Sequence, residues 1–139
     1  MPDVFHSPAL RAALGLPASP TPNDARADGE IMSQPEARLG TSIRHEMIKR
    51  GAFGFKIHGG PTMMVGLPDL IFCYRGRFVA LEVKMPEGVV SKIQARRIKE
   101  IRDAGGHAYV VRSVASAVRV LERVDRHIDS LPVESETGA

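Results

Sequence analysis

Residues 66–84, GLPDLIFCYRGRFVALEVK, constrain the fold of this chain most strongly. Two apolar runs, Leu70–Tyr74 and Phe78–Val83, are rich in β-branched and aromatic residues, as strands are. Arg75-Gly76 separates them, and a glycine that can take positive φ favours a two-residue turn. The stretch therefore predicts a β-hairpin.

The register of this hairpin places two acids face to face. With a two-residue loop Tyr74 pairs with Arg77, and counting outward pairs Asp69 with Glu82. Cβ atoms of such partners lie roughly 4.5–5.5 Å apart, and like charges there are destabilising. Lys84 points to the same face as Glu82 and can neutralise one charge. Mg²⁺ or Mn²⁺ could balance the remainder, because these ions take oxygen ligands.

A simpler interpretation stays open at this point. Acid and lysine pairs at strand ends are commonly solvated salt bridges. Against it, Glu82 and Lys84 belong to a run, from Val79 onward, that is too apolar for a freely exposed strand. Asp69 follows Pro68 at the strand entrance, where proline is tolerated. We therefore expect the acids to be held on rigid, largely buried strands.

Pro68-Asp69 followed by Glu82-Val83-Lys84 resembles the signature of the PD-(D/E)XK nuclease superfamily. The longer pattern G-x-P-D, E-V-K-x-P-x-G-x-x-S-x-x-Q and a later G-G is similar to the virus-type replication-repair nuclease domain, VRR-NUC, over roughly residues 36–121. The resemblance implies a metal-dependent nuclease in which Asp69, Glu82 and the Val83 carbonyl hold one or two Mg²⁺ or Mn²⁺ ions. Lys84 would orient the attacking water.

The resemblance also implies a substrate and an assembly. Compact VRR-NUC domains resemble Holliday-junction or branched-DNA endonucleases that act as homodimers, since a four-way junction needs two symmetric cuts. Two alternatives remain. One is a nuclease that acts on flaps, nicks or single strands in replication and repair. The other is a non-catalytic nucleic-acid-binding subunit on the same fold.

Composition sets broad limits. The 139 residues suffice for one core, and a net charge of +3 is only a mild bias toward nucleic acid. A single cysteine, Cys73, excludes an internal disulfide and is expected to be a buried thiol. With no apolar run of membrane length and no signal peptide, we expect a protein of the cytoplasm of a microbe or phage-infected cell.

The predicted domain covers residues 33–131, between a proline-rich flexible segment, 1–32, and an acidic disordered tail, 132–139. Its first helix begins after Ser33 and stops at Gly51. Glu36 shares the helix face of the apolar residues Leu39, Ile43 and Met47. It matches a glutamate that assists metal binding in the resembled family, although a first-turn dipole role is the alternative.

A first strand is expected over Ala52–His58, followed by a loop that contains Gly59-Gly60. If this strand pairs antiparallel with the next, the loop lies at the same end of the sheet as Gly66. Gly60 would then let a phosphate backbone approach closely, although a plain turn is the better explanation of the glycines.

Ser91 and Gln94 form a capping box, in which the glutamine reaches back to the Ser91 amide. Gln94 also falls on the apolar face of the helix that follows, and the resembled family places this glutamine in the active site, so both roles stay open. Candidate DNA-binding residues are Ser91, Gly60 and three bases on the outer helix face, Lys92, Arg96 and Lys99. No partner for Arg97 is evident from the sequence.

The remaining pattern completes the fold class. Gly105-Gly106 ends the helix, and His107–Val111 is a short strand. The passage from Glu82 to Val111 is long enough for a parallel crossover between the two strands. Ser113 caps a final helix with Val114, Ala117, Val118 and Leu121 inward. We therefore expect an α/β protein with an αβββαβ restriction-endonuclease-like core, a mixed sheet flanked by helices, and a C-terminal helix.

Overall fold

The structure, a computed structural model, describes Ala13 and residues 33–133. Residues 33–133 belong to one compact unit, Met32–Ala139. The predictions for segment 1–32 and for most of tail 132–139 lie outside the described residues and stay predictions.

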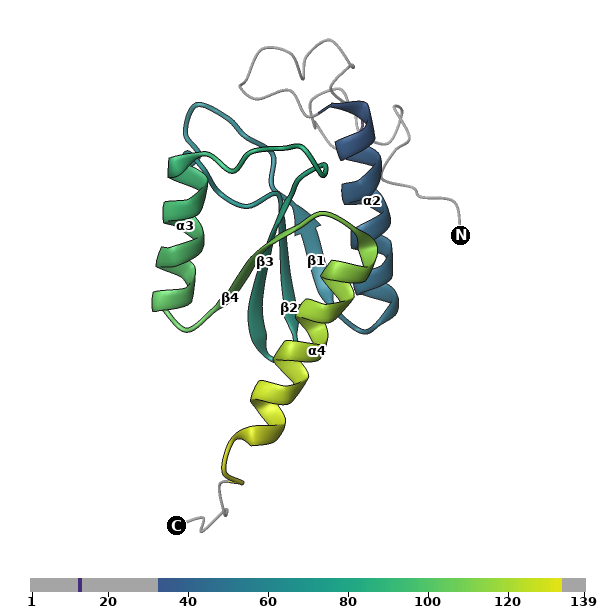
Figure 1. Cartoon of the computed structure of the whole chain (residues 1–139), viewed down its shortest axis with the longest axis vertical. Coiled ribbons are helices and arrows are strands. Elements are labelled where there is room, and N and C mark those ends of the chain that lie inside the picture. The colour runs from purple at the N-terminus through teal and green to yellow at the C-terminus, as the bar shows by residue number, and fades with distance from the viewer. Residues whose placement is uncertain (1–12, 14–32, 134–139) are drawn as a thin grey trace. The chain divides into compact units, whose positions relative to one another are not determined.

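The described chain forms three helices and a four-stranded sheet in the expected order (Figure 1). In sequence these are α2 (Gln34–Lys49), β1 (Phe53–Lys56), β2 (Leu70–Tyr74), β3 (Arg77–Val83), α3 (Lys92–Asp103), β4 (His107–Val111) and α4 (Val114–Ser130). The strand order is β1-β2-β3-β4, with antiparallel pairs except for parallel β3 and β4. This is the predicted α/β core with a mixed sheet.

The hairpin between β2 and β3 has the predicted two-residue turn. Arg75 and Gly76 have φ values of 49° and 76°, which is the signature of a type I′ turn. Positive φ is costly for an arginine. Its side chain, however, donates to Asp125 Oδ1 over 2.8 Å, and the Tyr74 hydroxyl donates to the same oxygen over 2.9 Å. The turn is thereby fastened to α4.

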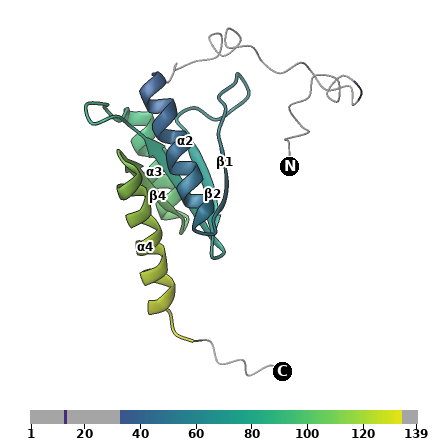
Figure 2. The ribbon, with the colours of Figure 1, turned by 90° about the vertical axis from the view of Figure 1, so that its right-hand side faces the viewer.

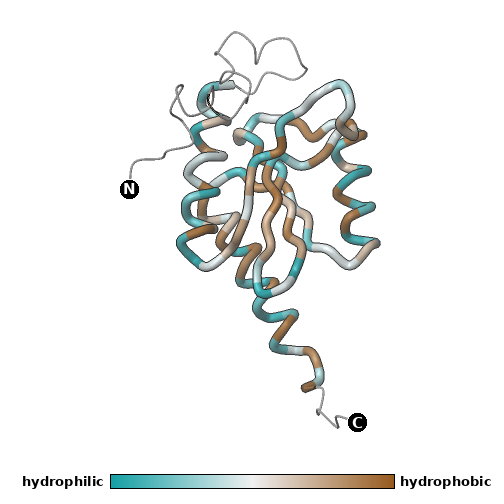
Figure 3. The backbone as a smooth tube through the Cα atoms, turned by 180° about the vertical axis from the view of Figure 1, so that it is seen from behind, coloured by the Kyte–Doolittle hydropathy of each residue, from teal (hydrophilic) through white to brown (hydrophobic). Residues whose placement is uncertain are grey.

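Helices cover the two faces of the sheet unequally. Helices α2 and α4 pack together on one face, and α3 lies on the other (Figures 1 and 2). The main core fills the α2–α4 side, where Phe72, Leu81 and Val79 are at most 1% exposed. Burial of each such side chain contributes roughly 1.5–3 kcal/mol. The apolar strands run through the centre of the unit in Figure 3.

Helix α4 presents a slightly different face from the predicted one. Its buried residues are Ala117, Val120, Leu121 and Val124, whereas Val114 and Val118 are only partly buried. None of the helices in the described residues is both long and apolar enough to span a membrane.

Cys73 is exposed, so the expectation of a buried thiol is wrong. The reason lies in the second face of the sheet. Phe53, Cys73 and Phe78 form one cross-strand row, and the two phenylalanines are 73% and 48% exposed. Helix α3 packs over β4 and the residues Ala80 and Ile71, and does not cover this row. An apolar sequence run identified the strand correctly but not which of its faces is covered.

Strand β1 is shorter than predicted, Phe53–Lys56 rather than Ala52–His58. Its partner β2 begins at Leu70, which pairs with Lys56, so Lys56 is the last residue of β1. One further bond, from Ile57 N to Asp69 O at 2.7 Å, closes the ladder. The loop between β1 and β2 therefore leaves the sheet beside Asp69, as the antiparallel pairing predicted.

Candidate active site

Asp69 and Glu82 lie together at the end of the hairpin away from its turn. The register runs from Tyr74–Arg77 to Leu70–Leu81, so the next pair outward is Asp69 and Glu82. Asp69 also reaches across to β3, where its Oδ2 accepts the Val83 N–H over 2.8 Å. The face-to-face acids predicted from the hairpin are confirmed.

Glu82 is a buried carboxylate that is only partly satisfied. Its side chain is 2% exposed. Oε1 accepts a hydrogen bond from Gln94 Nε2 over 2.9 Å and lies 3.5 Å from the Lys84 ammonium. Oε2 is buried and has no hydrogen-bond donor within the described part of the chain. A buried carboxylate oxygen without a donor is costly, so this oxygen needs a proton or a cation.

The pKa values of the two acids follow from this crowding. Burial, and then the charge of Asp69, raises the pKa of Glu82 to about 8, even though Lys84 acts in the opposite direction. Burial also raises the pKa of Asp69, while the Val83 N–H and Lys84 partly oppose the rise. In the absence of a cation the pair therefore retains a proton near neutral pH, and that proton can lie between the two carboxylates.

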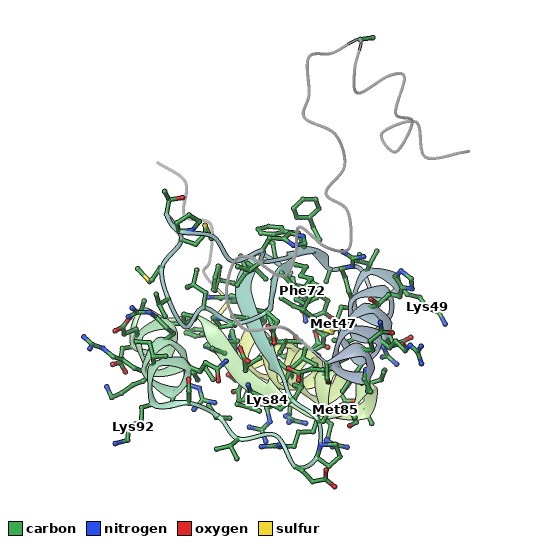
Figure 4. The ribbon with its side chains drawn as sticks, turned by 90° about the horizontal axis from the view of Figure 1, so that it is seen from above. Met47, Lys49, Phe72, Lys84, Met85 and Lys92 are labelled. Carbon is green, nitrogen blue, oxygen red and sulfur yellow. The ribbon has the colours of Figure 1, made fainter. Side chains whose placement is uncertain are left out.

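Lys84 is held in place by its backbone and by its surroundings. Its N–H donates to Val111 O of β4 over 3.0 Å, and its side chain is only 12% exposed. Gly88 packs against the lysine stem, because a Cβ there would lie 3.3 Å from Lys84 Cδ. Figure 4 shows Lys84 within the body of the unit, whereas Lys92 points outward from α3. The ammonium is thus confined next to Glu82.

Gln94 makes two kinds of side-chain contact, one at the start of α3 and one with Glu82. Its Oε1 accepts the Ser91 N–H over 3.0 Å, which completes a capping box with the Ser91 hydroxyl. Its Nε2 donates to Glu82 Oε1. The start of α3 and the orientation of the buried carboxylate are therefore fixed by one amide.

Two arginines that the sequence analysis did not assign hold the loops around the site. Arg97 Nε donates to Val65 O over 2.9 Å, which ties the loop before Asp69 to α3. Arg112 Nη1 donates to Met85 O and Gly88 O over 2.7 and 2.8 Å, which ties the loop after Lys84 to the end of β4. The position of Arg97 on the apolar face of α3 was the only sequence signal for either contact.

Glu36 lies in the first turn of α2 and is half-buried. Its N–H donates to the Ser33 hydroxyl, which caps the helix. No three His, Cys, Asp or Glu side chains among the described residues are grouped so that they could share a metal ion. The structure therefore does not bring Glu36 into one cluster with Asp69 and Glu82, and its role as a third ligand stays a prediction.

The predicted DNA-binding residues differ in their surroundings. Lys92 is exposed at the start of α3, next to the partly buried Ser91. Arg96 and Lys99 are exposed but form ion pairs with acids of the same helix, Glu100 and Asp103. Gly60 lies in the loop between β1 and β2, and a Cβ there would meet no atom within 4 Å. The open space at Gly60 leaves the predicted approach of a phosphate backbone there a prediction.

The donor set fits a hard divalent cation. The two carboxylates and a strand carbonyl offer oxygen atoms, which Mg²⁺ and Mn²⁺ prefer, and one of these oxygens is buried without a donor. Two protein carboxylates leave several coordination positions for waters or substrate oxygens, as is usual for Mg²⁺ sites. The residues that would hold the ion are Asp69, Glu82 and Val83.

Comparison with solved structures identifies the fold. No family model matches the sequence, and no curated protein matches it significantly. A structure described as a VRR_NUC domain shares 23% identity and a TM-score of 0.56, over 65% of this chain and 97% of its own. A VRR_NUC domain protein shares 18% identity and a TM-score of 0.51, over 67% and 89%.

A third structure, the Holliday junction resolvase Hjc of Archaeoglobus fulgidus, shares 22% identity over 55% of this chain and 67% of its own, with a TM-score of 0.46. At these identities the likeness concerns the fold. The chain has the fold of VRR_NUC domains, as its motifs predicted.

Proposed function

We propose that this chain is a Mg²⁺- or Mn²⁺-dependent endonuclease that hydrolyses DNA phosphodiester bonds. The observation that carries the proposal is the pair Asp69 and Glu82. One buried oxygen of Glu82 has no donor among the described residues, and a lysine lies 3.5 Å from the other. A cation shared by the two carboxylates would satisfy the oxygen that otherwise needs a proton.

Each residue has a defined part in this proposal. A divalent ion bound by the site would polarise the scissile phosphate and lower the pKa of an attacking water. Lys84, confined beside Glu82, would orient that water and stabilise negative charge that develops on the phosphate. Gln94 is a positioning residue, since its amide holds the Glu82 carboxylate.

Branched DNA, such as a Holliday junction, is the substrate that we propose first. The described residues form one small domain around the site, with no recognition helix evident, so recognition would rest on the shape and backbone of the DNA. Two symmetric cuts in a four-way junction would require a homodimer. A nuclease for flaps, nicks or single strands is the alternative within the same chemistry.

One experiment separates these possibilities. The purified protein is incubated with a labelled four-way junction, a flap and a linear duplex, each with Mg²⁺, Mn²⁺ or EDTA. Junction cutting that needs the metal supports the proposal, and preferred cutting of the flap supports the alternative. Binding of DNA without any metal-dependent cutting would favour a non-catalytic subunit. Light scattering of the same sample measures whether a dimer forms.

A further inference from the structure

A small cavity adjoins Asp69, and Glu82 is not among its lining residues. It lies between α2 and the ends of β1 and β2, and its volume is about 40 Å³. Its lining consists of Ala37, Gly40, Thr41, Arg44, Lys56, Asp69 and Leu70. At roughly 10–15 Å³ for each water-sized probe, the space accommodates about three water molecules, which is comparable with the oxygens of one phosphate group.

The cavity exists because the facing side chains of α2 are small. Ala37, Gly40 and Thr41 occupy one stripe of the helix at spacings of three and four residues. A Cβ added at Gly40 would meet no atom within 4 Å, so no neighbour fills the space left by the glycine. The Thr41 hydroxyl donates to Ala37 O over 3.0 Å and is therefore not a donor toward the cavity.

Two cations line this space, and neither has a fixed partner among the described residues. Arg44 comes from α2 and Lys56 from the end of β1, and both are partly buried. Neither forms a hydrogen bond or a short ion pair with any other residue of the described chain. Asp69 is the acid that borders them, and Lys56 acts on it electrostatically. Arg96 and Lys99, by contrast, form ion pairs with acids of their own helix.

The balance of charge in the cavity favours an anion. Two cations face one carboxylate, and that carboxylate already accepts the Val83 N–H and faces Glu82. A partly buried arginine and lysine that converge on one space supply several N–H donors, which is the chemistry that binds phosphate oxygens. A carboxylate ligand has only two acceptor oxygens and would leave some of these donors without a partner.

We propose that Arg44 and Lys56 form a phosphate subsite that holds the DNA backbone phosphate next to the scissile one. The inference rests on the proposed nuclease function for its biological ligand, but the cavity can be tested alone. The subsite and the acid pair share Asp69 as a common wall. A phosphate bound in the cavity therefore fixes where the neighbouring phosphate lies relative to Glu82 and Lys84.

The first test measures binding to the wild-type protein and involves no DNA cleavage. Inorganic phosphate, and separately the dinucleotide thymidylyl-thymidine, are titrated in EDTA while the amide resonances are recorded by NMR. The expected result is a saturable shift of the Gly40, Thr41 and Lys56 amides with either probe. Shifts with the dinucleotide alone would restrict the subsite to phosphodiesters. Absence of shifts at these amides with both probes would overturn the proposal.

The second test compares Arg44→Ala and Lys56→Ala with the control Lys49→Ala. Lys49 is an exposed base of α2, the helix that also carries Arg44, and its side chain points away from the sheet (Figure 4). Junction binding is measured in EDTA between about 50 and 200 mM salt. Each subsite variant should bind about three- to tenfold more weakly and lose about one unit of salt slope. Equal behaviour of all three variants would refute the subsite.

The outcomes also distinguish this inference from the proposed function. If the wild-type protein cuts DNA but the phosphate titration and the variants show no effect, only the subsite is wrong. If the protein cuts nothing and yet phosphate shifts the cavity amides, the subsite stands and the nuclease proposal fails. Unfolding curves of the three variants check that each remains folded, and Arg44→Lys should restore most of the binding.

Discussion

Replacement of Glu82 by glutamine should stabilise the metal-free protein at alkaline pH. Glutamine keeps an oxygen that can accept from Gln94 and places an amide where the second, donor-less oxygen lies. That amide can donate to Asp69, so Glu82→Gln imitates the protonated acid. The substitution thus removes the need for a proton at the site while leaving its shape unchanged.

The magnitude follows from the raised pKa of Glu82. Its pKa rises from 4.5 to about 8 on folding. Because the folded state holds a proton that the unfolded chain releases, the free energy of unfolding falls as pH rises through this window. At about 1.36 kcal/mol per pKa unit, the wild-type protein loses up to about 4 kcal/mol between pH 4.5 and 8. Glu82→Gln should not show this loss.

Urea unfolding in EDTA at about pH 5 and about pH 8 measures the effect. The wild-type protein and the variant should agree within about 1 kcal/mol at the lower pH, and the variant should be more stable at the higher pH. Glu87→Gln, which removes an exposed carboxylate from the loop after β3, is the matched control. A variant that is less stable than wild type at both pH values would refute the account of the acid pair.

Three further substitutions test the site. Lys84→Ala should abolish metal-dependent cutting while junction binding stays within about twofold, and Lys49→Ala, at an exposed base of α2, should still cut; loss of binding with Lys84→Ala would contradict the role given to the lysine. Gln94→Glu keeps an acceptor for the helix cap but replaces the donor to Glu82 by a third buried acid, so cutting should fall about tenfold or more and the melting temperature should fall as well. Arg112→Ala frees the loop after Lys84 and should increase hydrogen exchange at Gly88; unchanged exchange would argue against this tether.

Local rules were sufficient for much of the fold and for the centre of the site. The I′ turn at Arg75-Gly76 sets the register of the hairpin, and the register alone brings Asp69 opposite Glu82. Capping chemistry likewise located the start of α3 at Ser91. These features depend on neighbours a few residues apart, so their geometry can be counted along the sequence.

What the sequence could not supply depends on packing between distant elements. Cys73 is exposed because α3 packs over β4 and leaves this part of the sheet uncovered. The residues of β2 alone do not indicate where α3 packs. The cavity beside Lys56 arises only when the small residues of α2 lie over the end of β1. In the sequence Lys56 is simply a polar residue at a strand end, which normally faces solvent.

Gln94 combines a local contact, which the sequence predicts, with a contact between distant elements, which it does not. The capping pattern and the apolar face of its helix suggested separate roles, and the structure shows that one amide both completes the helix cap and donates to Glu82. The roles of Glu36 and Gly60 remain predictions, because no contact described in the structure ties either residue to Asp69 and Glu82.

A crystal soaked in Mn²⁺ and measured at the manganese absorption edge tests the central claim most directly. The account predicts an anomalous peak within about 2.5 Å of carboxylate oxygens of both Asp69 and Glu82, with the Val83 carbonyl as a further ligand. The peak should vanish in Asp69→Asn. Clear density for the acid pair without such a peak, with Glu82 bound only to Gln94 and Lys84, would contradict the account.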